Sequence, residues 1–162
     1  MNETKLNILC ECCGEMAVTE TTKRMPIEYG DGDDAIVLYA QVPVFVCKSC
    51  EFEYTDSRAE DIRHDTICKH LNLLTSVELK SMRNDLGWSV AKLAAETALG
   101  QASLTRWENC QCFQTKANDK LLRFTFEKHG VFIKDKASKG SYQFRTIVIN
   151  PFMEARAAAF SL

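Results

Sequence analysis

Two cysteine pairs constrain the fold of this chain more than any other feature of its sequence. Two residues separate Cys10 from Cys13 and also Cys47 from Cys50, and 33 residues lie between the pairs. This spacing lets each pair turn so that both sulfurs face one ion, and four thiolates complete a tetrahedral zinc site. We therefore predict one structural Zn²⁺ per chain. Its binding would supply much of the folding energy of a domain with little other core.

A redox motif and unrelated buried thiols are the alternatives for these cysteines. A thioredoxin-like motif follows a strand, begins a helix and does not occur twice, so the duplication favours the metal site. Cys12 could exchange into the first pair, but the spacing favours Cys10 and Cys13. Because protein fills all four positions, we expect a closed, structural site. The other cysteines and the histidines have no paired spacing, so we expect ordinary thiols and solvated imidazoles at Cys68, Cys110, Cys112, His64, His70 and His129.

Composition places further bounds on the function. No apolar run approaches the ~20 residues that span a bilayer, and the first residues lack the apolar centre of a signal peptide. We expect a cytoplasmic protein without membrane association, where eight cysteines serve as metal ligands and free thiols rather than disulfides. The sequence has no Ser/His/Asp constellation and no paired carboxylates. We therefore expect no enzymatic activity.

Charge is unevenly distributed along the chain. Residues 1–72 hold 7 Lys or Arg against 14 Asp or Glu, a net charge of −7, within a total of −2. Residues 73–130 carry +2 and residues 131–162 carry +3. Phosphates repel an acidic surface and attract a basic one. Contact with nucleic acid is therefore expected in the rear half of the chain.

The spacing of apolar residues predicts an α+β chain in three parts. Residues 1–72 are expected to form a small, zinc-stabilised antiparallel β domain. It contains an Asp-Gly turn signal between two strand-like runs and a linking helix from Ser57 to Leu74. Residues 73–130 are expected to form an all-α, five-helix domain. Residues 131–162 are an apolar C-terminal extension.

Capping signals divide the helical domain into segments. Thr75 to Glu78 is a capping box, Ser89 caps the next helix, and Ala98 to Gly100 forms a turn. A helix over 101–109 follows the turn, and a last helix covers about 118–128. The apolar faces of these helices predict a core of Leu79, Met82, Leu86, Leu93, Ala94, Leu104, Trp107, Leu121, Leu122 and Phe126.

The helical domain resembles the Xre/Cro–C1 family of helix-turn-helix repressors. Three short motifs carry the resemblance: Leu86-Gly87-Trp88-Ser89, Leu93-Ala94 and Leu104-Thr105-Arg106-Trp107-Glu108-Asn109. In such domains the second helix of the unit lies in the major groove of DNA. The resemblance implies a structural ion pair between Arg83 and Glu108.

The same resemblance assigns the DNA-contacting residues. It implies that Gln101, Ala102 and Arg106 contact base edges, since Gln suits adenine and Arg suits guanine. Ser103 and Thr105 would bond phosphate or base edges, and Lys92 and Asn109 would bond backbone phosphate.

Two positions depart from the family pattern. Val90 stands where the family usually has a Gln that bonds phosphate, and Ala98 stands where it usually has a turn glycine. The second change is expected to cost about 1 kcal/mol unless Gly100 takes up the unusual dihedral.

A two-knuckle zinc domain followed by such a helix-turn-helix resembles the MqsA/YgiT family of type II antitoxins, over roughly residues 8–128. This implies a zinc domain that binds a cognate toxin and a homodimeric repressor that binds its own operon at a palindromic operator. The acidic residues 1–72 suit a basic toxin that acts on RNA. The alternatives are a prophage-type transcriptional regulator without a toxin, and an antitoxin whose C-terminal tail binds a SecB-like chaperone.

The extension over residues 131–162 lies outside this resemblance. Residues 131–133 and 142–149 alternate like strands around a possible hairpin turn, and residues 151–162 are apolar. Three alternatives remain at this point: a hairpin and short helix that cover the helical domain, a segment that binds a toxin or chaperone, and disorder. The sequence does not identify the operator, the toxin or the dimer surface.

Overall fold

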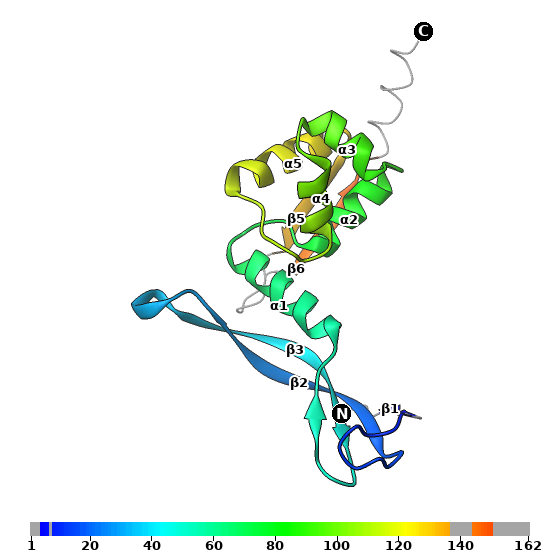
Figure 1. The fold of residues 1–162 in the computed structure, drawn as a ribbon. Coiled ribbons are helices and arrows are strands. Elements are labelled where there is room, and N and C mark those ends of the chain that lie inside the picture. Colours follow the sequence, from blue (N-terminus) through cyan, green and yellow to red (C-terminus); the bar gives the residue numbers. More distant parts are fainter. Residues whose placement is uncertain (1–3, 7, 137–143, 151–162) are drawn as a thin grey trace. The chain divides into compact units, whose positions relative to one another are not determined.

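The computed structural model describes residues 4–6, 8–136 and 144–150. The chain divides into two compact units, Met1–Ile67 and Cys68–Leu162. Each unit combines antiparallel strands with helix, which agrees with the predicted α+β class (Figure 1). None of the helices among the described residues combines the length and the apolarity needed to cross a bilayer.

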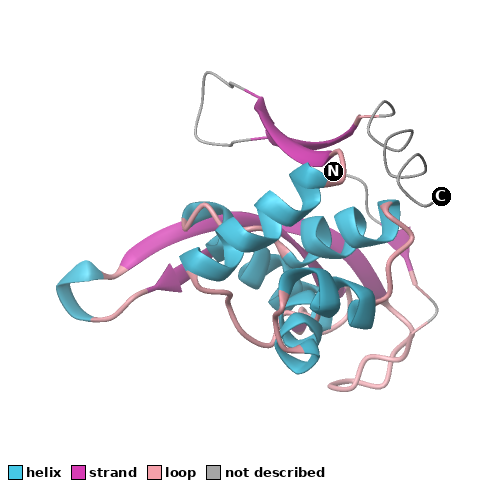
Figure 2. Cartoon of the chain, turned by 90° about the horizontal axis from the view of Figure 1, so that it is seen from above, coloured by secondary structure: helices cyan, strands magenta, loops and turns pink. Residues whose placement is uncertain are grey.

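A long antiparallel hairpin forms the centre of the first unit. Strands β2 (Val18–Tyr29) and β3 (Ile36–Cys47) pair along their whole length, with Val18 opposite Cys47 at one end. The predicted Asp-Gly turn lies at the other end. There, a short 3₁₀ helix, η1 (Gly32–Asp34), closes the tip of the hairpin (Figure 2).

Two short outer strands widen the sheet only near the cysteine pairs. β1 (Thr4–Lys5) pairs with β2, and β4 (Glu53–Tyr54) pairs with β3, which gives the order β1-β2-β3-β4. β4 reaches only Phe45 and Val46 of β3. Pro43 lies beyond that reach, so its missing N–H interrupts no pairing with β4, as expected for a proline at a sheet edge.

Helix α1 (Ser57–His70) follows the sheet and is tied to it at its first turn. The Arg58 guanidinium donates to the Glu20 carboxylate at 3.0 Å and lies 5.5 Å from the ring centre of Phe45. The helix ends four residues before the predicted Leu74. Asn72 has a φ of +56°, a left-handed conformation that ends helices and that Asn tolerates better than most residues.

Residues 73–130 contain four helices rather than the predicted five, because α1 ends before that segment. They are α2 (Ser76–Asp85), α3 (Val90–Thr97), α4 (Gln101–Glu108) and α5 (Lys116–Lys128). The predicted capping box is present: the Thr75 hydroxyl accepts from the backbone N–H of Glu78, whose carboxylate accepts from the backbone N–H of Thr75.

The apolar faces of these helices meet in one core. Most of the predicted core residues are buried there: Leu79, Met82, Leu93, Leu104, Trp107, Leu122 and Phe126. Leu74 and Val131, which were not predicted, are buried in the same core. Leu86 and Ala94 are partly buried against this cluster. The prediction for Leu121 was wrong, because its side chain lies on the outer face of α5 and is 37% exposed.

A two-stranded antiparallel sheet completes the second unit, so this unit is not all-α. β5 (Val131–Lys136) pairs with β6 (Phe144–Ile149), as the hairpin alternative for the C-terminal segment predicts. Val131 is fully buried in the helical core, and Ile133 and Ile147 pack against it. The extension is therefore part of the domain as far as β6. The predicted apolar segment 151–162 lies outside the described residues.

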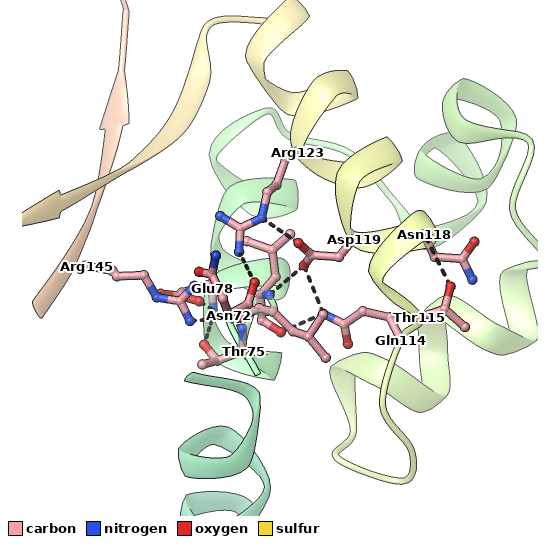
Figure 3. A network of polar contacts seen from close by, with 11 residues as sticks. Asn72, Thr75, Glu78, Gln114, Thr115, Asn118, Asp119, Arg123 and Arg145 are labelled. Carbon is pink, nitrogen blue, oxygen red and sulfur yellow. Dashed lines mark hydrogen bonds and ion pairs between the residues drawn. The ribbon is translucent and has the colours of Figure 1, made fainter. Parts of the chain in front are cut away.

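A buried carboxylate joins the start of the second unit to α5 (Figure 3). Asp119 accepts hydrogen bonds from the backbone N–H of Leu74 and from Nε of Arg123, both at 2.6 Å. The Gln114 amide donates to the carbonyl oxygen of Leu74, also at 2.6 Å. Asp119 is 4% exposed, and burial of a carboxylate is tolerated only when it is hydrogen-bonded or paired.

Arg145 makes a second polar connection, between β6 and the start of α2. It donates to the carbonyl oxygen of Leu73 at 2.7 Å and pairs with Glu78 at 3.2 Å (Figure 3). Its side chain is only 3% exposed. Breaking a buried ion pair by removing one partner typically costs ~3–5 kcal/mol. The hairpin is therefore held to the helices by charge as well as by apolar packing.

The turn between α3 and α4 has the strained residue that the sequence suggests. Ala98 adopts the left-handed conformation itself, with φ +56° and ψ +21°, whereas Gly100 has a φ of −65°. Gly100 therefore does not take up the unusual dihedral. A non-glycine residue in this region costs roughly 1–2 kcal/mol.

Replacing Ala98 with Gly should stabilise the second unit by about 0.5–1 kcal/mol, because relief of the left-handed strain outweighs the greater unfolded-state entropy of Gly. Thermal unfolding followed by Trp fluorescence should show a rise of a few degrees, since Trp88 and Trp107 both lie in this unit.

Gly87 offers the matched control. It has a φ of +64°, and an added Cβ would meet nothing within 4 Å. Gly87→Ala should therefore lower stability by about 1 kcal/mol for conformational reasons alone. A decrease in melting temperature for Ala98→Gly would contradict the strained turn.

Candidate metal centre and nucleic-acid interface

The four predicted cysteines come together at one end of the first unit. Their sulfurs all lie within 4.8 Å of one another, and each pair contributes two of them. The separations across the pairs are 3.6 Å for Cys10 to Cys50 and 3.6 Å for Cys13 to Cys47. Sulfurs bound tetrahedrally at ~2.3 Å would lie about 3.8 Å apart, so the cluster can hold a metal ion with little movement.

The backbone forms the same kind of turn at both cysteine pairs. The backbone N–H of Gly14 donates to the carbonyl oxygen of Cys10 at 2.8 Å, and that of Glu51 donates to the carbonyl oxygen of Cys47 at 2.9 Å. Gly14 has a φ of +76° and Glu51 a φ of +61°. The second knuckle therefore keeps the same geometry with a residue that is less suited to it than glycine.

A small apolar cluster supports these sulfurs. Cys10 and Cys47 are buried with Val18 and Phe45, whereas Cys50 is half-buried and Cys13 is exposed. The Phe45 ring stacks on that of Tyr54 with centroids 5.0 Å apart. Cys12 is exposed and does not join the cluster.

The four thiols change one another's ionisation. Burial opposes ionisation of Cys47, but the backbone N–H groups of Cys50 and Ser49 and the neighbouring thiols lower the pKa of Cys47 to about 6. A backbone hydrogen bond at Phe52 favours the thiolate of Cys50, yet burial and the neighbouring thiols raise the pKa of Cys50 well above its ordinary value. Thiolates so close together repel one another, and a divalent cation removes that obstacle to ionising all four.

A second group of metal-ligating side chains lies on α1. His64, Asp65 and Cys68 place one ligand atom each within 4.8 Å of one another. His64 is 6% exposed and Cys68 is fully buried. The prediction of a solvated imidazole was therefore wrong for His64. The sequence signal was the His-x-x-x-Cys spacing, which puts both side chains on the same side of a helix.

The predicted ion pair is present in the second unit. Arg83 donates to both carboxylate oxygens of Glu108, from Nε at 2.6 Å and from Nη2 at 2.8 Å, and this pairing raises the pKa of Arg83. Its Nη1 also donates to the carbonyl oxygen of Trp88 at 2.6 Å and to Asn84 at 2.9 Å. One guanidinium thereby fixes α4 to α2 and to the turn that precedes α3.

Helix α4 turns its apolar side inward and its polar side to solvent. Leu104 and Trp107 are buried in the core. Four of the five residues of α4 predicted to contact DNA are exposed and Ser103 is half-buried: Gln101, Ala102, Ser103, Thr105 and Arg106. Asn109, also exposed, caps the C-terminal end of α4.

Lys92 and Val90 lie at the start of α3. The exposed Lys92 ammonium donates to the Glu96 carboxylate at 2.6 Å and lowers the pKa of Glu96. Exposed i,i+4 pairs are worth only about 0.3–0.5 kcal/mol, so a phosphate could replace Glu96 at little cost. Val90 packs partly against the core, and its apolar side chain offers no hydrogen bond at the position where the family pattern has Gln.

No protein-family model matches the chain, and a search of curated proteins finds no match.

Removal of the metal from the cysteine cluster should unfold the first unit while sparing the second. Each unit has its own apolar cluster, and a metal ion bound by four cysteines would contribute on the order of 10 kcal/mol to folding. We expect a chelator to abolish the near-ultraviolet signal of the Phe45–Tyr54 stack and to leave Trp fluorescence unchanged.

Cys47→Ser should have the same effect as the chelator. It should weaken metal binding at least about a hundredfold, since the loss of even an outer-sphere partner of a ligand costs about 10–100-fold. Cys12→Ser is the matched control and should bind metal normally, because Cys12 lies outside the cluster. Equal metal content in both variants would show that the cluster is not the binding site.

Proposed function

We propose that this protein is a DNA-binding antitoxin: a zinc-stabilised repressor that neutralises a cognate toxin and represses its own operon. The observation that carries the proposal is the exposed polar side of α4 behind a three-residue turn, anchored by the Arg83–Glu108 pair. Zinc is the favoured metal for four cysteine sulfurs, one ion per chain at the cluster of the first unit.

The DNA-binding part of the proposal rests on how α4 is presented. Its buried side is fixed by Leu104 and Trp107, and a bidentate charge-assisted pair prevents it from rotating. Side chains that contact bases must be held in position, because a misplaced hydrogen bond loses discrimination between bases. Gln101 and Arg106 are the two residues on this side that can form bidentate contacts with adenine and guanine.

Homodimerisation and a palindromic operator follow from the size of the interface. A single short helix covers only half of a typical site, and such repressors gain affinity by binding two half-sites about 34 Å apart. The modest charge of +2 on residues 73–130 supports the same inference, because one copy would neutralise few phosphates.

The toxin-binding part rests on charge and on the division into units. Residues 1–72 carry a net charge of −7, which repels DNA and attracts a basic protein. A toxin that acts on RNA needs a basic surface for its substrate, and an acidic domain can cover that surface. A transcriptional regulator without a toxin partner is the second candidate, and the experiments below separate the two.

Base contacts and phosphate contacts should respond differently to mutation. Arg106→Ala should cost about 1–3 kcal/mol of binding and relax sequence preference at one position. Lys92→Ala should weaken binding to all sequences alike and reduce the salt dependence by about one unit of slope. Selection from a randomised duplex library identifies the preferred DNA sequence, and salt titration of that duplex then measures both effects.

Lys23→Ala is the control for the loss of one positive charge. Because Lys23 pairs with Glu53 in the first unit, this variant should leave the salt dependence of DNA binding unchanged. Retention of full sequence preference in Arg106→Ala would exclude α4 as the base-contacting helix.

Neutralisation of a toxin should require the first unit, whereas DNA binding should not. When the product of the adjacent reading frame arrests growth, co-expression of the wild-type chain should restore it, and Cys47→Ser should fail to do so while still binding the selected duplex. Cys12→Ser should behave as wild type. If the wild-type chain binds DNA but neither binds nor neutralises that product, the regulator without a toxin is the correct alternative.

A further inference from the structure

The metal-ligating group on α1 points to a second centre that the proposed function does not use. We propose that His64, Asp65 and Cys68 bind one divalent transition-metal ion, separately from the four-cysteine cluster. Their ligand atoms already lie within 4.8 Å of one another. The chain would then hold two metal ions of different coordination chemistry.

One continuous helix sets the arrangement of these ligands. Successive residues of an α-helix are about 100° apart around its axis, so positions i, i+1 and i+4 fall within an arc of about 100°. His64 Nδ1 and Asp65 Oδ1 share a hydrogen bond of 3.2 Å, which an ion bound by both atoms would replace. Nitrogen and oxygen ligands at ~2.0–2.1 Å from a tetrahedral ion lie about 3.3–3.4 Å apart, so this pair already has nearly the spacing of two ligands.

Charge and burial favour a cation at this position. His64 and Cys68 are buried and Asp65 is partly buried, so an unbalanced charge would be costly there. A divalent ion with one thiolate, one carboxylate and one neutral imidazole has no net charge. Cys68 also belongs to the last turn of α1, where the helix dipole stabilises positive charge.

The ligand set selects the class of metal. A mixture of imidazole nitrogen, thiolate sulfur and carboxylate oxygen suits Zn²⁺, Co²⁺ or Ni²⁺, whereas Mg²⁺ and Ca²⁺ prefer oxygen alone. Three protein ligands leave one position of a tetrahedron open for water or another small donor, unlike the closed four-cysteine cluster. An ion held across one turn of α1 would stabilise the C-terminal half of that helix.

Cobalt distinguishes the two centres, because its absorption reports the number of thiolate ligands. Full-length protein is first loaded with one equivalent of Zn²⁺, which is expected to fill the four-cysteine cluster, and is then titrated with Co²⁺. We expect a second equivalent to bind, with tetrahedral bands and the weak charge-transfer absorption of a single thiolate. A total of one metal ion per chain, with no cobalt bound after zinc loading, would overturn the proposal.

Two substitutions locate the cobalt on α1. His64→Gln should weaken cobalt binding at least about tenfold, since the loss of even an outer-sphere partner of a ligand costs about 10–100-fold. Cys68→Ala should abolish the charge-transfer band. His70→Gln, on the same helix but exposed, is the matched control and should bind cobalt as wild type does.

Repeating the titration in the Cys47→Ser background separates the centres. Cobalt bound with the same single-thiolate spectrum there belongs to α1 whatever the fate of the cysteine cluster. Cobalt binding that survives both His64→Gln and Cys68→Ala unchanged would place the ion elsewhere and refute the α1 site.

Discussion

The close approach of four cysteine sulfurs, which cannot all ionise without a cation, is the constraint on which the first unit depends. The sheet brings the four sulfurs within 4.8 Å of one another, and the residues that bury them form a small cluster around Val18 and Phe45. Other apolar side chains of this unit are also buried, among them Ile27, Val42 and Val44. The end of the sheet that holds the sulfurs, however, has only this small apolar cluster to offset the entropy of ordering it. A divalent cation changes the balance, because it converts repulsion among the thiolates into coordination and links the start of β2 to the end of β3.

In the second unit, buried charged side chains hold the secondary-structure elements together. Arg83 and Glu108 hold α4 to α2, Asp119 holds α5 to the start of the unit, and Arg145 holds β6 to α2. Each of these groups is directional, so together they fix the positions of short helices that apolar contacts alone would leave free to slide. The exposed side of α4 thus lies on a rigid support, which the proposed contact with DNA would require.

The parts of the fold that could be predicted are those that depend on local sequence. The Cys-x-x-Cys spacing, the capping box at Thr75 and the helical periodicity each follow from a few neighbouring residues, and the four-sulfur cluster was found in this way. Apart from this cluster and the Arg83–Glu108 pair, which the family resemblance implied, contacts between distant segments were missed. The bond from Leu74 N–H to Asp119 joins residues 45 positions apart, and Val131 of β5 enters a core that was predicted from the helices alone. The spacing of apolar residues also placed Leu121 in the core. Leu121 is next to the buried Leu122, and which of the two faces the core depends on how α5 is rotated about its axis.

Metal binding in the first unit also bears on the separation of the two proposed activities. A divalent ion with four thiolates carries a net charge of −2, beyond the −7 that the Lys, Arg, Asp and Glu side chains give residues 1–72. Cys47, with a pKa of about 6, already supplies about one of these two negative charges at neutral pH without the metal. The loaded unit is therefore more acidic than its metal-free form, repels DNA phosphates more strongly and attracts a basic partner more strongly. The neutral centre proposed on α1 leaves this charge unaltered. Coordination by sulfur would thus contribute both to the stability of the first unit and to its negative charge.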